Sequence, residues 1–423
     1  MGGGLLMTVL VAQYLGPEGF GLLNYAFAFS TFFQLLTGLG FEGTLVKSTL
    51  ENPALARRIM GSAIIMRLAA SLLMLGLSMG IICLAEPDRP VLWQMMAMLG
   101  LAFVVQAGET IDFQFQASQQ MHKTSLIRLA GFLTSVLFRL WLIFAHKDLV
   151  WFASVLLLES FVVAFLFLLV SRNDRFGFPD LRLSSSGLWK SLLRNGMPMV
   201  FSSMVWFLYS RLDQIMVARY LGDAQSGYFS VSTRIVEVFI FLPTAFASAM
   251  LPGLIHSLRE KSEIFQRKMQ MLTDMVLLLG VLVCAFLVLF APMLVRYSFG
   301  EQFLPASEAL MIQGFVCVFS FLGSAAQPFF VARGYTGMLL LRNLIGAALN
   351  LGLNIFWIPA YGIAGACYAT LISTFSVHVL FNALNASTRE ILQLQLHSLL
   401  HLFSGKSWVF LWQFAKNYRK GQT

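Results

Sequence analysis

The chain of 423 residues is 58% hydrophobic and only 12% charged, whereas soluble domains carry about 25% charged residues. This composition excludes an ordinary water-soluble globular protein, and apolar runs near the roughly 20 residues of a helical span predict transmembrane helices rather than barrel strands. The net charge of +9 does not indicate a nucleic-acid ligand, because the basic residues lie in short connections between the apolar runs, where they report membrane topology.

Twelve apolar segments follow one another along the chain and predict an all-α polytopic membrane protein. Apart from the short first one, the segments are near the length of a helical span. A polar linker and an internal repeat divide them into two predicted six-helix bundles with a transport site, the predicted central cavity, between them. The predicted spans are 2–15, 22–41, 59–84, 91–112, 124–145, 149–170, 192–218, 228–254, 271–295, 306–331, 338–358 and 362–384.

The longest polar connection, residues 171–191, divides these spans into two sets. We interpret it as a cytoplasmic linker between an N-terminal bundle, residues 1–170, and a C-terminal bundle, residues 192–384. Residues 385–423 are predicted to form a cytoplasmic amphipathic tail, which ends in aromatic and basic residues typical of a membrane-interface anchor.

Lysine and arginine gather on one side of the predicted topology. They populate the even-numbered connections and the tail, whereas the odd-numbered connections hold only Arg89, Lys147, Arg219 and Arg296. Because cytoplasmic loops carry the excess of basic residues, both termini are predicted to be cytoplasmic.

The two halves are related by an internal repeat. Residues 11–16, VAQYLG, match residues 217–222, VARYLG, at an offset of 206, and each copy is predicted to close one helix and turn into the next through a short loop. Repeats with an even number of helices place a transport site between the halves. The seventh span begins near Leu192, so its counterpart would begin before Met1, and we expect the start of the first helix to be missing.

Arginines inside the predicted spans are the best candidates for a substrate site, because a charge at the bilayer centre costs about 2.5–3.5 kcal/mol and usually faces a cavity or a partner. Guanidinium groups bind phosphate through planar, bidentate hydrogen bonds. On the eleventh span, Arg342 is accompanied by a stripe of asparagine side chains. The predicted substrate-binding residues are Arg67, Arg128, Arg139, Arg211, Arg234, Arg342, Asn343, Asn350 and Asn354.

The alternative for these arginines is a structural ion pair or a side chain that reaches the membrane boundary. Arg234 has Glu237 three residues on, which is an ion-pair spacing, and Arg128 and Arg342 lie near the predicted cytoplasmic boundary. Acidic residues in or beside the spans are candidates for ion coupling or, more simply, counter-charges to the arginines: Glu109, Asp112, Glu159, Asp213, Glu237 and Asp274. The sequence gives no catalytic, nucleotide-binding or metal motif, so no cofactor and no enzymatic activity are expected.

At these residues the chain resembles a known family. YLGPEGFG at 14–21, RLDQIM at 211–216, GYFSVSTRIVEVF at 227–239 and YGIAGA at 361–366 are similar, in this order, to the polysaccharide transporter family, the Wzx-type O-antigen and exopolysaccharide flippases. This family belongs to the multidrug/oligosaccharidyl-lipid/polysaccharide exporter superfamily. The resemblance covers about residues 5–385.

The resemblance implies a flippase that moves undecaprenyl-diphosphate-linked oligosaccharide across the cytoplasmic membrane by alternating access. It also implies partners such as a polysaccharide polymerase or glycosyltransferases. A cation-coupled multidrug exporter of the same fold is the alternative, although such cavities favour acidic residues. A membrane-embedded glycan enzyme is a further alternative, disfavoured because every predicted outer connection is short.

Overall fold

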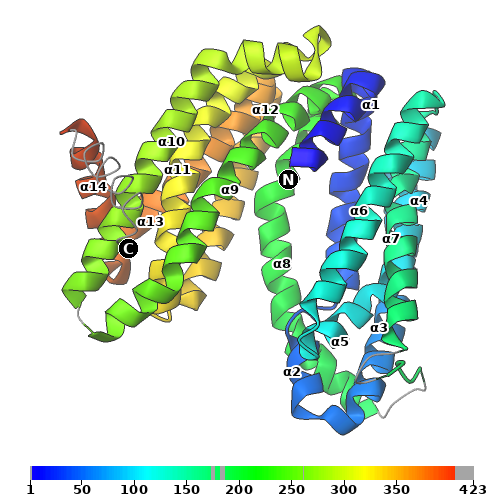
Figure 1. The fold of residues 1–423 in the computed structure, drawn as a ribbon. Helices are drawn as coiled ribbons and strands as arrows, with labels where there is room; N and C mark the ends of the chain where they lie inside the picture. The colour runs from blue at the N-terminus through cyan, green and yellow to red at the C-terminus, as the bar shows by residue number, and fades with distance from the viewer. Residues whose placement is uncertain (1, 173–176, 182–185, 261, 405–423) are drawn as a thin grey trace. The chain divides into compact units, whose positions relative to one another are not determined.

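The computed structural model describes residues 2–172, 177–181, 186–260 and 262–404. Helices joined by short turns make up this part of the chain, and it contains no strand (Figure 1). Parts of the predicted linker, residues 173–176 and 182–185, lie outside the described residues. So do residues 405–423 of the predicted tail, which include its aromatic and basic end.

The contacts divide the chain into two compact units. The N-terminal unit is Leu6–Ile215, and the C-terminal unit is Met216–Thr423 together with Met1–Leu5. The helices of the N-terminal unit, drawn from blue to green in Figure 1, are α1 (Gly2–Thr37), α2 (Thr44–Glu51), α3 (Ala56–Ala85), α4 (Pro90–Gln106), α5 (Asp112–Ala117), α6 (Met121–Phe144), α7 (Leu149–Ser171) and most of α8 (Ser186–Leu221).

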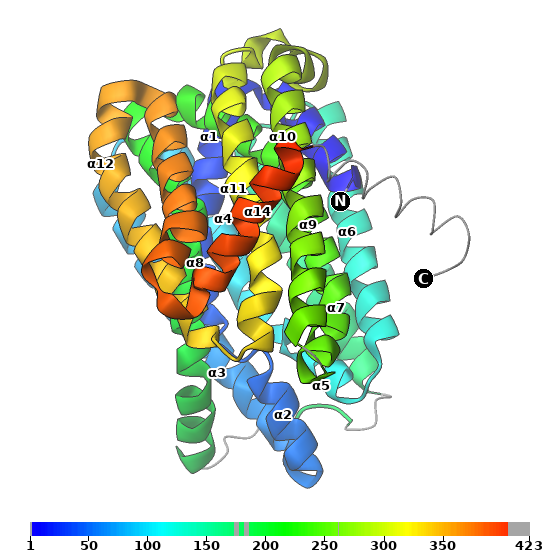
Figure 2. The same cartoon turned by 90° about the vertical axis from the view of Figure 1, so that its left-hand side faces the viewer.

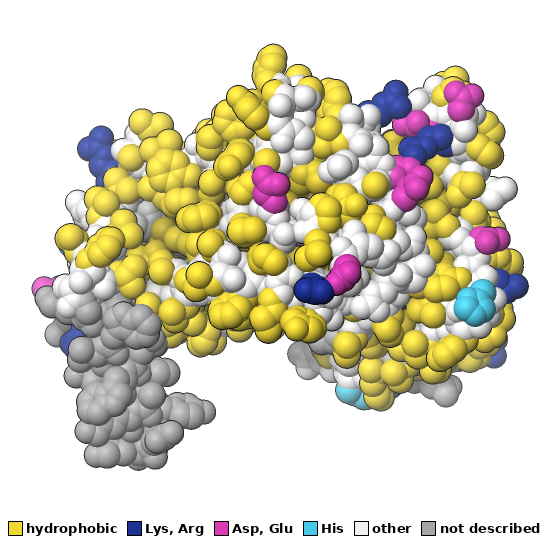
Figure 3. Space-filling model, turned by 90° about the horizontal axis from the view of Figure 1, so that it is seen from above, with side chains coloured by type: hydrophobic (Ala, Val, Ile, Leu, Met, Phe, Trp, Pro, Cys, Tyr) yellow, Lys and Arg dark blue, Asp and Glu magenta, His cyan; other side chains and the backbone are white. Residues whose placement is uncertain are grey.

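Helix α6 of the N-terminal unit buries several small or polar residues and exposes large apolar ones. In α6, Thr124, Gly131 and Ser135 are buried, whereas Leu133 and Leu137 are exposed. Gly131 packs so closely on α7 that an added Cβ would lie 2.3 Å from a methyl group of Val163. Such a pattern suits lipid, where helices associate through small residues and no water solvates an outer polar face. Figure 3 looks from above onto the ends of the helices, where acidic and basic side chains lie among hydrophobic ones.

The C-terminal unit is built around α11 (Ala306–Ala332), which packs against its long neighbours α9, α10 and α12. A short π-helix, Ser376–Leu380, ends the last long helix. It seats His378 against Gly323 of α11, where a Cβ would lie 2.3 Å from the imidazole ring. The other helices are α9 (Asp223–Glu260), α10 (Ser262–Phe299), α12 (Thr336–Phe375), α13 (Phe381–Leu384) and α14 (Arg389–Phe403).

Nine helices in the described part of the chain are long and apolar enough to cross a membrane. Two of these long elements, α1 and α12, each contain two of the predicted spans, because each joins two helices across a kink at a glycine with non-helical backbone angles, Gly16 (φ 69°) or Gly362 (φ 62°). The remaining predicted span is α8, whose charged and amide residues keep it out of the nine. The prediction of a polytopic helical membrane protein is confirmed.

The loop predicted between residues 15 and 22 is wrong, since the helix resumes directly after Gly16. The equivalent residue of the second repeat, Gly222, also has a positive φ, 86°, and separates α8 from α9. Glycine adopts this left-handed conformation without the steric cost that other residues meet. The repeat therefore encodes the same one-residue turn twice.

The described part of the predicted linker is docked on the N-terminal unit. Arg57 Nε donates to Phe178 O over 2.8 Å, and Arg57 O accepts from Asp180 N over 3.0 Å. Asp180 O passes so close to Gly61 of α3 that an added Cβ would lie only 1.7 Å away. The linker thus contacts α3 through backbone groups.

Candidate functional site

A polar cavity of about 650 Å³ lies inside the N-terminal unit. Its walls come from α1, the connection between α1 and α2, α3, the segment from α4 to α6, α7 and α8. The polar side chains that line it are Gln34, Glu42, Arg67, Gln106, Glu109, Asp112, Gln116, Arg128, Glu159, Ser160 and Ser203. A cavity of this size and polarity within membrane-spanning helices is the best candidate site in the described part of the chain.

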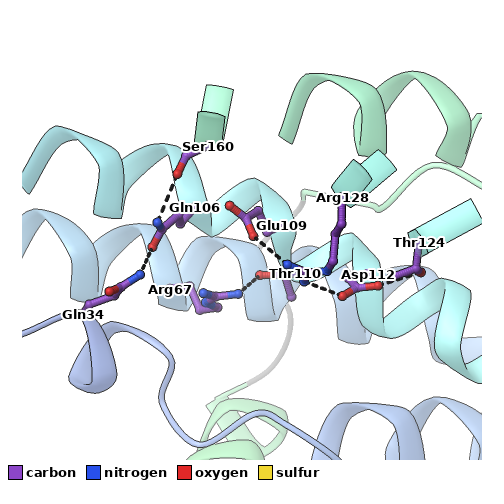
Figure 4. Close-up of polar contacts among 9 residues, drawn as sticks. All are labelled: Gln34, Arg67, Gln106, Glu109, Thr110, Asp112, Thr124, Arg128 and Ser160. Carbon is purple, nitrogen blue, oxygen red and sulfur yellow. Dashed lines mark hydrogen bonds and ion pairs between the residues drawn. The ribbon is translucent and has the colours of Figure 1, made fainter. Parts of the chain in front are cut away.

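One wall of the cavity is a hydrogen-bonded chain of three side chains (Figure 4). Gln34 Nε2 of α1 donates to Gln106 Oε1 of α4 over 2.8 Å, and Gln106 Nε2 donates to Ser160 Oγ of α7 over 3.0 Å. Polar groups within a helix bundle in lipid must find partners inside the protein. This chain therefore holds three helices in register and leaves polar atoms along the cavity wall.

The residues drawn on the other side of Figure 4 form an ionic cluster. Arg128 Nη2 of α6 donates to Asp112 Oδ2 over 2.6 Å, and Nη1 lies 3.8 Å from Glu109 Oε2. The other oxygen of Asp112 accepts from Thr124 Oγ1 over 2.8 Å. Asp112 is buried, whereas the Arg128 side chain is about half exposed (53%). Arg128 therefore keeps part of its guanidinium group available to the cavity.

Arg67 of α3 has a different environment. Its Nη1 donates to Thr110 Oγ1 over 3.0 Å, and this hydroxyl in turn donates to Ala107 O over 2.7 Å. The buried Nε has no hydrogen-bond partner among the described residues. A buried donor without a partner costs about 1–3 kcal/mol, and an anion in the cavity would supply the missing acceptor.

The Asp112–Arg128 contact gives the first prediction. We expect Asp112→Asn to lower the stability of the purified protein by about 1–3 kcal/mol, because the new amide would present N–H groups to the Arg128 guanidinium in place of a carboxylate. Thermal unfolding in detergent would measure the change. Glu51→Gln is the matched control, since it breaks the Lys47–Glu51 pair, whose side chains are both largely exposed, and exposed pairs contribute about 0–1 kcal/mol. Equal shifts for the two variants would contradict the prediction.

The structure brings five of the predicted residues together in this cavity: Arg67, Arg128, Glu109, Asp112 and Glu159. The other predicted residues lie elsewhere. Arg234 and Glu237 of α9 form the predicted ion pair, with Nη1 and Oε2 2.9 Å apart. Arg139 is half-buried on α6, and Arg211 and Asp213 lie on α8.

Two residues of the predicted stripe on α12 contact each other. Asn354 Nδ2 donates to Asn350 Oδ1 over 3.0 Å, as their four-residue spacing predicts, and both side chains are buried. Arg342 on the same helix is buried as well, with its guanidinium carbon 4.9 Å from the centre of the Phe330 ring. Asn343 is half-buried. This stripe therefore contributes to the packing of the C-terminal unit.

Asp274 has a histidine, not an arginine, as its ionic partner. Its Oδ2 lies 2.9 Å from His401 Nδ1, and its Oδ1 accepts from Gln270 Nε2 over 2.7 Å. One oxygen thus joins α10 to α14, and the other accepts a hydrogen bond within α10.

The charges of the N-terminal cavity are mixed. Two guanidinium groups, Arg67 and Arg128, face the carboxyl groups of Glu42, Glu109, Asp112 and Glu159. Sequence reasoning did not single out Glu42, nor the amides Gln34, Gln106 and Gln116. The signal that could have found these amides is a long amide side chain within an otherwise apolar span, which needs a partner or a cavity just as a charge does.

These features define the class of the protein. A bundle of membrane-spanning helices around an internal polar cavity is the architecture of a membrane transporter. The chain belongs to the polysaccharide biosynthesis protein family, whose model matches residues 1–257.

Two solved structures share its fold. An inward-facing multidrug resistance MATE family transporter of the MOP superfamily is similar with a TM-score of 0.73 at 16% identity, over 92% of this chain and 95% of that one. The lipid II flippase MurJ, in an inward closed conformation, is similar with a TM-score of 0.69 at 15% identity, over 97% of this chain and 94% of that one. At these identities the similarity shows the fold alone.

A similar sequence is the probable low-salt glycan biosynthesis flippase Agl15 of Haloferax volcanii. It is 26% identical over 205 residues, which are 46% of this chain and 41% of that protein. The chain matches less than half the length of the curated relatives to which it is similar.

Proposed function

We propose that the protein is a flippase for lipid-linked oligosaccharide. Its substrate would be an undecaprenyl-diphosphate-linked repeat unit of O-antigen or exopolysaccharide, moved across the bacterial inner membrane by alternating access between two six-helix bundles, residues 1–170 and 192–384. Membership of a polysaccharide biosynthesis family and similarity to a probable glycan flippase support this proposal.

The observation that carries the proposal in the structure is Arg67. Its buried Nε has no acceptor among the described residues, and it lines a cavity that also presents Arg128 and three amide side chains. Guanidinium groups match the oxygens of a diphosphate, and amides match the hydroxyl groups of sugars. The prenyl chain would stay in the lipid, where it needs no polar partner.

The remaining arginines and the polar stripe would complete the path. Arg139 lies in the N-terminal bundle, and the others lie in the C-terminal bundle: Arg211, Arg234, Arg342, Asn343, Asn350 and Asn354. Glu109, Asp112 and Glu159 would serve as counter-charges to the guanidinium groups or as sites of ion coupling. The basic connections of the sequence support cytoplasmic termini, and a polysaccharide polymerase or glycosyltransferases would be the protein's partners.

A cation-coupled multidrug exporter is the second candidate. The MATE transporter shares the fold, and the cavity presents four carboxyl groups beside its two guanidinium groups. Carboxylates at a cavity wall would attract an organic cation. The two candidates differ in the sign of the charge that the cavity must bind.

Genetic complementation distinguishes the two candidates. In a bacterium that lacks its own O-antigen flippase, expression of this chain should restore surface polysaccharide, and it should leave resistance to cationic dyes unchanged in a strain without drug exporters. Immunoblotting of membranes would confirm equal protein amounts. Dye resistance without any surface polymer, tested in hosts that make several different repeat units, would overturn the flippase proposal in favour of the exporter.

A further inference from the structure

Helix α14, Arg389–Phe403, follows the last predicted span and packs obliquely across α10 and α11 of its own unit (Figure 2). Its 15 residues are about 22 Å long at 1.5 Å per residue, which is too short to cross a hydrocarbon core of about 30 Å. The helix therefore lies along the bundle instead of forming a further span.

The inward face of α14 combines the buried apolar residues Ile391 and Leu394 with polar groups that are bonded to the unit. Gln270 Nε2 of α10 donates to Leu394 O over 3.1 Å and to Ser398 Oγ over 2.7 Å. Asp274 one turn further along α10 holds His401. These contacts repeat at successive turns, so the polar groups of α14 are used inside the protein.

Both ends of this contact are reinforced. Arg333 Nη2, at the end of α11, lies 2.8 Å from Glu390 Oε2, and its guanidinium carbon lies 5.2 Å from the centre of the Phe329 ring. Gln395 Nε2 donates to His378 O in the π-helix over 2.9 Å. The orientation of α14 about its own axis is thereby fixed.

From Leu396 to Phe403 the exposed residues of α14 are apolar except His397, whereas Arg389 and Gln393 are exposed earlier in the helix. Leu396, Leu400 and Phe403 follow one another at spacings of four and three residues, which places them on one face, and they are 50%, 64% and 86% exposed. A helix that lies on a protein surface in water has the opposite arrangement, with its apolar stripe toward the core and its polar face outward. Water is therefore a poor environment for this face.

The contacts also give the level of α14 relative to the membrane. Helix α10 has 38 residues and is about 57 Å long, so it extends beyond a hydrocarbon core of about 30 Å. The residues that bind α14, from Gln266 to Asp274, lie in its first turns, and the apolar run 275–295 follows directly. Helix α14 thus runs from the polar extension of α10 to the point where α10 enters the apolar zone.

We propose that α14 is an interfacial membrane helix, whose stripe of Leu396, Leu400 and Phe403 binds the acyl chains of the adjoining lipid leaflet. The partner is the bilayer, because the polar side is already bonded within the unit and the exposed side is apolar at the level of the membrane boundary. The sequence after Ser404 has the aromatic and basic composition of an interfacial anchor and favours the same partner.

Spin-label accessibility in the full chain tests this proposal. Single cysteines would replace Leu400 or Phe403 in a variant whose four cysteines are changed to serine or alanine, reconstituted in vesicles of phosphatidylethanolamine and phosphatidylglycerol. Oxygen partitions into lipid, and a charged nickel chelate stays in water. Leu289, which is 72% exposed on α10, gives the lipid reference, and exposed Glu263 gives the water reference.

The ratio of oxygen to nickel accessibility at Leu400 and Phe403 should equal that at Leu289 and exceed that at Glu263 severalfold. A label at Gln393, an exposed residue that lines a groove together with Glu263 and Gln266 at the polar start of α10, should resemble Glu263. High nickel accessibility at Leu400 and Phe403 would overturn the proposal in favour of an aqueous helix. Low accessibility to both probes would overturn it in favour of a protein partner.

Discussion

Replacement of Arg67 by alanine should reduce glycan export about 10- to 100-fold, since a hydrogen bond to a charged group contributes about 1.5–3 kcal/mol and each 1.4 kcal/mol is a factor of ten. The loss should not come from misfolding. Thr110 Oγ1 still donates to Ala107 O without Arg67, and the substitution removes a buried donor that has no partner among the described residues. Surface polysaccharide in the complementation strain, normalised to membrane-inserted protein, measures the effect.

Arg58→Ala is the matched control for Arg67→Ala, because Arg58 lies on the same helix but is exposed and outside the cavity. Arg67→Lys keeps the charge but loses the planar, bidentate geometry, so it should fall between the wild type and the alanine variant. Normal export by Arg67→Ala at normal protein abundance would remove Arg67 from the substrate site. Arg342 is less suitable for such a test, since its burial against Phe330 would make any loss ambiguous.

Replacement of Gly40 by alanine should prevent the N-terminal unit from reaching its stable fold. Gly40 has a φ of 64°, and an added Cβ would lie 2.0 Å from Gly196 O of α8 and 3.0 Å from Met199 Cβ. The left-handed conformation alone costs a non-glycine residue about 1–2 kcal/mol. The overlap with backbone adds to this cost, because the start of α8 must move away. Detergent-solubilised protein should show a large loss of monodisperse material and a lower unfolding temperature.

Gly43→Ala separates the two causes. Gly43 lies in the same connection with a similar φ of 74°, but no atom comes within 4 Å of the position of its Cβ. It should therefore show the conformational cost alone, about 1–2 kcal/mol. If both alanine variants lose the same stability, the contact between Gly40 and α8 does not support the fold.

Charged residues within the predicted spans identified only part of the lining of the cavity. Arg67, Glu109, Asp112 and Arg128 come from three consecutive predicted spans, and the search for charges inside spans found each of them. It did not find Gln34, Gln106 and Ser160, whose chain of hydrogen bonds joins α1, α4 and α7. Uncharged polar residues are common in transmembrane helices, so only their convergence in space distinguishes these three.

The sequence by itself determined the helical membrane fold, the internal repeat and the Arg234–Glu237 pair. Hydrophobic length, the VAQYLG and VARYLG segments and a three-residue spacing are local along the chain, and the structure agrees with each. Local signals also explain the error at residues 16–21. Proline and glycine indicate a loop there, but a single left-handed glycine is sufficient to redirect a helix.

Only the tertiary structure decided which polar residues meet. Arg128 pairs with Asp112, Asp274 binds a histidine of α14, and Arg342 stacks on Phe330. These contacts depend on how each helix is rotated about its axis. That rotation is set by close packing at small residues, such as Gly131 against Val163. A helix in lipid has no water-facing side to orient it, so its apolar composition alone does not predict the rotation.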